Sequence, residues 1–305
     1  MSGHDHEHGA AMRSEGRRRL TVVLAITSLV LVVEVVGAII SGSLALLADA
    51  GHMLTDVAGL TLALVAAVLG QRPATDSRTW GYRRLEVLAA AAQAAVLLAV
   101  GGFVIVQGVR RLVSPPDVES GLMMVFGVVG LVGSTVSVAV LARSRAANLN
   151  MRAAFLEVVG DALGSVAVIV AAVVIAATGW SRADAVASLL IGALIMPRTA
   201  KLLRDSLNVL LESTPAGMEL SEVREHLLQV PHVYDVHDLH ASQVATGLPV
   251  LTVHAVVDDE CFHDGHLMRM LDELQDCLSG HFDVQHSTIQ FEAASHSAHE
   301  PAAHR

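Results

Sequence analysis

The chain has 305 residues, of which 53% are apolar and 16% are charged, and its mean hydropathy is +0.54. Because soluble domains carry about 25% charged residues, this composition excludes an ordinary soluble protein and indicates a membrane protein. The two cysteines exclude a disulfide framework and a four-cysteine zinc site.

The charge is spread unevenly along the chain. The formal net charge is −10, and residues 208–305 alone carry 3 basic and 16 acidic residues. Nucleic-acid binding requires a basic face, so we expect no nucleic-acid partner. An acidic region attached to a membrane region favours a cation as the ligand.

Six apolar segments have the length of about 20 residues that crosses a hydrocarbon layer of about 30 Å. They lie at about 20–40, 44–69, 86–109, 119–142, 154–178 and 183–204. The first is too long for a cleavable signal sequence and has no small-residue cleavage site. The sequence therefore predicts an all-α six-helix transmembrane bundle over residues 18–207, surrounded by lipid.

Basic residues gather in alternate connections between these segments. They precede the first segment, separate the second from the third and the fourth from the fifth, and follow the sixth; examples are Arg17, Arg84, Arg143 and Lys201. By the positive-inside rule, both termini face the cytoplasm of a multi-pass protein in the plasma or inner membrane.

The pattern changes after residue 211. Two helical segments alternate with strands in the order Glu219–Leu228, Val233–Leu239, Pro249–Val257, His266–Leu278 and Val284–Glu292. This α-β-β-α-β order predicts a small cytoplasmic α+β domain over residues 208–292, with one face of its sheet covered. The polar, histidine-containing ends, 1–17 and 293–305, are expected to be disordered.

Two pairs of ionisable residues lie inside the apolar segments, where such groups are costly and usually functional. His52 and Asp56 are four residues apart, as are Glu157 and Asp161. That spacing places each pair on one face of a helix. Two helices that meet along these faces would join one imidazole and three carboxylates, a donor set that suits a tetrahedral divalent ion, above all Zn²⁺.

The alternative is a hydrogen-bonded cluster of protonated acids, because three carboxylates beside one imidazole repel one another unless protons or a metal neutralise them. The metal-bound state and the protonated state of these residues are linked. Ligands must lose protons to bind a metal, so a site that opens alternately to each side would exchange a cation for protons.

Six motifs resemble those of the cation diffusion facilitator family, the zinc and related divalent-metal/proton antiporters. They lie at residues 43–56, 72–86, 150–165, 210–215, 236–240 and 287–292. The resemblance covers residues 18–292 in the family's order. It implies a homodimer, six spans and a cytoplasmic metal-binding domain of ferredoxin-like fold, with His52, Asp56, Glu157 and Asp161 at the transport-site positions.

The chain departs from the zinc members of that family at Glu157, where they commonly have histidine. A donor set of one nitrogen and three oxygens is harder, so Co²⁺, Cd²⁺, Mn²⁺, Fe²⁺ and Ni²⁺ become alternatives to Zn²⁺. The segment from Gln71 to Arg84, which holds an additional metal site in some relatives, contains Asp76 but no histidine. We therefore expect no metal site there.

By the same similarity, a second, regulatory metal site lies in the cytoplasmic domain near the dimer seam. Its candidate ligands are His237 or His240, with His254, His286 and Glu292. From the residues alone, half-buried histidines on strands are as often structural as metal-binding.

The sequence therefore predicts a proton-coupled exporter of Zn²⁺ or a similar ion rather than an enzyme. A membrane-embedded metalloenzyme needs an open coordination position and usually a motif such as HExxH, which the sequence lacks. A membrane-anchored metal sensor would not need ionisable residues within the lipid. A passive channel is disfavoured because tight binding by four ligands slows exit.

Overall fold

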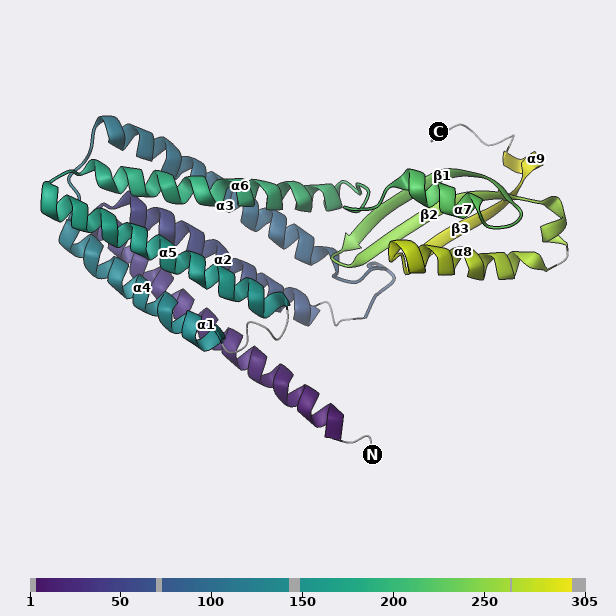
Figure 1. The fold of residues 1–305 in the computed structure, drawn as a ribbon, viewed down its shortest axis with the longest axis horizontal. Coiled ribbons are helices and arrows are strands. Elements are labelled where there is room, and N and C mark those ends of the chain that lie inside the picture. Colours follow the sequence, from purple (N-terminus) through teal and green to yellow (C-terminus); the bar gives the residue numbers. More distant parts are fainter. Residues whose placement is uncertain (1–3, 70–72, 143–148, 264, 298–305) are drawn as a thin grey trace. The chain divides into compact units, whose positions relative to one another are not determined.

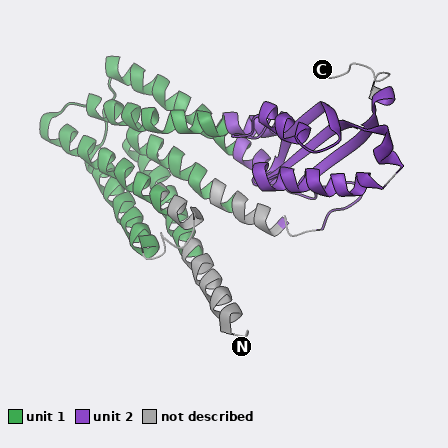
Figure 2. Cartoon of the chain, turned by 45° about the vertical axis from the view of Figure 1, so that its right-hand side comes forward, with its two compact units in different colours: residues 1–65, 92–203 green, residues 66–91, 204–305 purple. Residues whose placement is uncertain are grey.

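A computed structural model describes residues 4–69, 73–142, 149–263 and 265–297. Inside these ranges, the side chains at 4–20, 59, 60, 62–68, 149–154, 157 and 297 lie outside the description. The chain divides into two compact units, residues 1–65 with 92–203 and residues 66–91 with 204–305 (Figure 2).

The first unit is built from long helices (Figure 1). In chain order they are α1 (His4–Ser41), α2 (Leu44–Leu69), α3 (Arg84–Val113), α4 (Ser120–Ala142), α5 (Leu149–Thr178) and α6 (Arg182–Leu210). Within the described residues, all except α2 contain a stretch long and apolar enough to cross a membrane. With the 26 residues of α2, they form the predicted bundle of six apolar helices.

All six helices contribute buried residues to one apolar cluster, through Ala38, Leu44, Val104, Met123, Val168 and Ile191. Many large apolar side chains face outward instead, among them Leu29, Phe103, Val125 and Leu194. An apolar outer surface is suited to lipid, which is the environment that the sequence predicts.

A tight turn and a buried carboxylate fix the start of α2. Gly42 has a φ of +70°, a conformation that favours glycine, and it joins α1 to α2. Asp184 of α6 accepts hydrogen bonds from the backbone N–H groups of Leu44 and Ala45 at 2.8 and 3.1 Å. Arg111 lies 3.4 Å from the same carboxylate. Asp184 thus satisfies otherwise unpaired N–H groups and complements the positive end of the helix.

The second unit contains the predicted small α+β domain. Its elements are α7 (Leu220–Leu228), β1 (Val233–Ala245), β2 (Leu248–Val257), a 3-10 turn η1 (Asp259–Phe262), α8 (His266–Phe282), β3 (His286–Ala293) and α9 (Ala294–Ser297). The sheet order is β1-β2-β3, with β1 antiparallel and β3 parallel to β2. The predicted α-β-β-α-β order and the ferredoxin-like class are confirmed.

One face of this sheet packs against α7 and α8. Val236, Leu239 and Ala241 of β1 join Val223 of α7 and Leu274 of α8 in its apolar core. The step of three from Val236 to Leu239 departs from strand alternation because the register shifts between His237 and His240.

The shift places both histidines on the sheet face opposite the core. His254 alternates with core residues Val253 and Ala255 of β2, so it shares that opposite face.

Candidate metal centres

Three of the four predicted intramembrane ligands meet between α2 and α5. His52 Nε2 lies 3.6 Å from Asp56 Oδ2 and 4.0 Å from Asp161 Oδ1. One ligand atom from each residue lies within 4.8 Å of the others. His52 and Asp56 share a face of α2 through their spacing of four, and α5 brings Asp161 to them. We call this group the membrane triad.

The membrane triad is largely enclosed by protein. Asp161 is buried, and His52 and Asp56 are half-buried. His52 Nδ1 is buried and has no hydrogen-bond partner among the residues that the structure describes. Glu157 lies one turn before Asp161 on α5, but its side chain is outside the described part. A buried, unsatisfied nitrogen beside two carboxylates is a site at which a cation would restore the missing interactions.

Hydrogen bonds hold the turn of α2 that carries His52 and Asp56. The hydroxyl of Thr55 donates to the backbone oxygen of His52 at 2.6 Å. The amide of Gln93, on α3, donates to the backbone oxygen of Thr55. These bonds tie α2 to α3 at the level of the triad, which limits the movement of His52 and Asp56.

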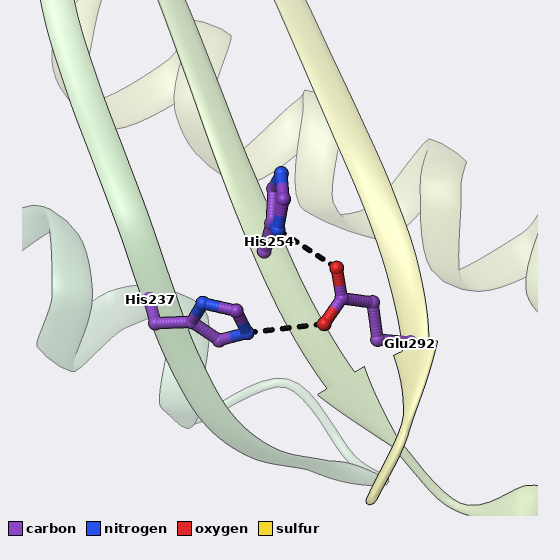
Figure 3. A group of neighbouring side chains, drawn as sticks. All are labelled: His237, His254 and Glu292. Carbon is purple, nitrogen blue, oxygen red and sulfur yellow. Dashed lines mark hydrogen bonds and ion pairs between the residues drawn. The ribbon is translucent and has the colours of Figure 1, made fainter. Parts of the chain in front are cut away.

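A second group, the tail triad, lies on three adjacent strands (Figure 3). Its members are His237 of β1, His254 of β2 and Glu292 of β3, again with one ligand atom each within 4.8 Å. Glu292 Oε2 lies 3.1 Å from His237 Nε2, and Glu292 Oε1 lies 2.7 Å from His254 Nδ1. The amide of Gln290 also donates to Glu292 at 2.6 Å. A single buried carboxylate thus contacts both imidazoles, through a hydrogen bond with His237 and at ion-pair distance from His254.

The other two tail candidates lie outside this group. His240 Nε2 lies 2.8 Å from Asp238 Oδ1, and Asp238 Oδ2 lies 3.8 Å from His254 Nε2. His286, at the start of β3, packs its ring against that of Trp80 at 4.9 Å. The sheet register pairs His286 with Val250, whereas His254 is opposite Gln290.

Sequence reasoning did not single out Asp238 or Gln290. Two features of the sheet bring these residues to the site. The strand register places Gln290 opposite His254, and the bulge in β1 gives Asp238 its positive φ of 47°.

The tail also contains a more exposed histidine–carboxylate pair. His232 Nδ1 lies 3.0 Å from Asp258 Oδ2. Hydrogen bonds from His232 and then Tyr234 hold the pKa of Asp258 below its usual range, and the bond to Asp258 raises the pKa of Tyr234. Elsewhere on this unit, burial raises the pKa of the Cys277 thiol. None of these residues belongs to the tail triad.

Comparison with known proteins matches both units of the chain. The family described as "Cation efflux transmembrane domain" matches residues 20–211, and "Cation efflux protein, cytoplasmic domain" matches residues 215–294.

Three relatives match along almost their whole length. The metal cation efflux system protein CzcD of Cupriavidus metallidurans is 42% identical over 99% of this chain and 94% of its own. The zinc transporter ZitB of Escherichia coli K12 is 40% identical over 95% of this chain and 92% of its own. The cadmium, cobalt and zinc/H(+)-K(+) antiporter of Bacillus subtilis is 33% identical over 97% of this chain and 93% of its own.

The bundle, the tail domain and these matches define a multi-pass membrane transporter of metal cations. The chain belongs to the cation diffusion facilitator family of metal cation efflux proteins.

Proposed function

We propose that this protein exports Zn²⁺ from the cytoplasm in exchange for protons and that the membrane triad, with Glu157, is its transport site. The observation that carries the proposal is the meeting of His52, Asp56 and Asp161 inside a bundle of apolar helices. Their donor atoms are the types that zinc binds, and Glu157 extends the same helix face by one turn. The relatives named as zinc transporters support zinc as the first choice.

Proton exchange follows from the chemistry of the donors. Carboxylates and a neutral imidazole bind the metal, whereas their protonated forms do not. When zinc leaves on the outer side, the triad carries uncompensated negative charge within the membrane, and protons are the counter-substrate that neutralises it. Each proton that arrives then disfavours rebinding of zinc.

The assembly we propose is a homodimer in the cell membrane, with both termini in the cytoplasm, a transmembrane region over residues 18–207 and a cytoplasmic domain over residues 208–292. The sequence supports this orientation through the basic residues of alternate connections.

The tail triad would hold a regulatory divalent ion. It offers two imidazole nitrogens and a carboxylate within 4.8 Å, a donor set that fits Zn²⁺ with one further ligand. A metal there would replace the bonds between Glu292 and its two histidines. His240 and His286 lie outside the triad in this arrangement, and a shift of β1 or a partner subunit would be needed to add them.

Zinc uptake into vesicles tests the transport proposal. Purified protein is reconstituted with an imposed pH gradient, and a fluorescent indicator follows zinc entry. Asp56→Ala and Asp161→Ala should each abolish gradient-driven uptake, because each removes a charged ligand. Asp117→Ala, which removes an exposed carboxylate between α3 and α4, should transport as the parent chain does. Uptake that persists in both triad variants would refute the assignment.

A further inference from the structure

Glu34 of α1 is a carboxylate inside the bundle that the membrane triad does not include. It is 0% exposed, and both its oxygens are buried without a hydrogen-bond partner among the described residues. An isolated ionised carboxylate in a low-dielectric interior is strongly destabilised unless a cation neutralises it. A side chain with this cost inside a membrane protein is a functional candidate.

The pocket around Glu34 is shaped by a glycine of α4. A Cβ atom on Gly130 would overlap Glu34 Oε1 and would lie 2.9 Å from Ser165 Oγ of α5. The absence of a side chain at this position therefore leaves the space that the carboxyl occupies. Helix α4 has no ionisable residue along its length, so it provides no charge to neutralise Glu34.

A row of polar groups links Glu34 to the membrane triad. Ser165, which borders the same space as Glu34, donates a hydrogen bond to Asp49 Oδ2 of α2 at 3.4 Å. Asp49 is also buried, and a Cβ on Gly164 would overlap its Oδ1. Asp161 of the triad lies one turn before Ser165 on α5. The row thus runs from the triad through Asp49 and Ser165 to Glu34.

Glu34 is placed to respond to the charge of the triad without binding the metal. Its charged neighbours in the described structure are Asp49 from α2 and Asp161 from α5. It is the one ionisable residue of Thr21–Ser41, the part of α1 whose side chains the structure describes. Arrival of a doubly charged ion at the triad would favour ionised Glu34, and departure of that ion would favour its neutral form.

We propose that Glu34 carries a counter-transported proton. The inference rests on the metal/proton exchange proposed above. When zinc binds, the O–H bond of the Glu34 carboxyl breaks, its electron pair stays on the oxygen, and the proton leaves to water. When zinc departs, a proton from the opposite side adds to the carboxylate and restores the neutral acid.

The test counts protons released per zinc bound by the full-length protein in detergent. Calorimetry in two buffers with different ionisation enthalpies gives that number together with the zinc affinity. Glu34→Gln keeps the shape of the neutral acid but cannot ionise. It should release about one proton fewer per zinc while zinc affinity changes less than about tenfold, because the metal ligands are retained. In vesicles, it should lose most of the stimulation of zinc uptake by a pH gradient.

The matched control is Ser137→Ala, which removes another buried polar group of the same bundle that has no hydrogen-bond partner among the described residues. It should release as many protons as the parent chain. If Glu34→Gln does not fold, Gly130→Ala replaces it as the test variant, because the added methyl group displaces the Glu34 carboxyl. The control for this variant is Gly127→Ala, whose Cβ would lie 3.1 Å from Val168.

The outcomes separate the two proposals. If the parent chain shows no response to a pH gradient, the exchange itself is wrong. If the parent chain responds and the Glu34 variants release the same number of protons, Glu34 is not a proton carrier.

Discussion

The two triads contain the same kinds of side chain but differ in how closely those side chains approach one another. In the tail triad, Glu292 lies 2.7 and 3.1 Å from its two imidazoles, which is hydrogen-bonding distance. In the membrane triad, His52 lies 3.6 and 4.0 Å from its carboxylates, and its Nδ1 has no partner among the described residues. The side chains of the tail triad thus contact one another directly, whereas those of the membrane triad lie farther apart.

The supporting elements explain this difference. Neighbouring strands hold the tail triad close together, so its side chains contact one another directly. The membrane triad lies on two separate helices, and a cation between its side chains would make shorter contacts than they make with each other. A site that must bind and release its ion in each cycle benefits from the looser arrangement, because strong internal bonds would compete with the metal.

Asp184 shows that a buried carboxylate in the bundle is not by itself a transport residue. Its oxygens accept bonds from two backbone N–H groups and from Ser43 Oγ, and Arg111 balances its charge. Glu34 has none of these interactions in the described structure. The presence or absence of partners therefore distinguishes a structural acid from one available to a proton.

The largest expected effect concerns the carboxylate of the tail triad. In a chain that already carries Asp56→Ala and Asp161→Ala, equilibrium dialysis should find zinc bound at the tail alone. Adding Glu292→Gln should weaken that binding by about 100-fold, because it removes the charged ligand that both imidazoles contact. His286→Ala in the same background should leave the affinity unchanged, since His286 packs on Trp80 outside the triad. Retained tight binding after Glu292→Gln would show that the zinc lies elsewhere.

The sequence predicted which membrane residues lie together better than which tail residues do. A spacing of four on a helix fixes which residues share a face, so His52 and Asp56 were paired without a structure. That α5 meets α2 at Asp161 depends on helix packing, which a pattern in one segment does not encode.

The residues of the tail triad could not be grouped from their spacing in the sequence alone. His237 and His240 are three residues apart and would lie on opposite faces of a regular strand. The bulge between them places both on the outer face, and Asp238 then bonds His240. His286 was grouped with Glu292 by similarity to the family, but the two lie six positions apart on the same extended strand.

A smaller effect is expected at Glu157. Glu157→His changes one oxygen donor to nitrogen and makes the donor set softer, which favours zinc over manganese and cobalt. Zinc transport should persist, and the ratio of zinc to manganese uptake in vesicles should rise by about tenfold. Leu156→His, one residue away on a different face of α5, is the control and should leave the ratio unchanged. An unchanged ratio in Glu157→His would mean that residue 157 does not set ion preference.

The smallest effect is expected at the exposed pair of His232 and Asp258. This pair shows what a histidine–carboxylate contact contributes without burial. The bond from His232 lowers the pKa of Asp258. The ionised carboxylate therefore stabilises the fold at pH values above the usual aspartate pKa of about 3.9. This contribution is lost as the pH falls through the lowered pKa of the folded state. His232→Ala should raise the pKa of Asp258, as followed by carboxyl ¹³C NMR titration. Stability at neutral pH should change little, because water screens exposed pairs. His226→Ala removes a histidine bonded to its own helix and should leave the titration of Asp258 unaltered. If His232→Ala also leaves it unaltered, Tyr234 alone accounts for the lowered pKa.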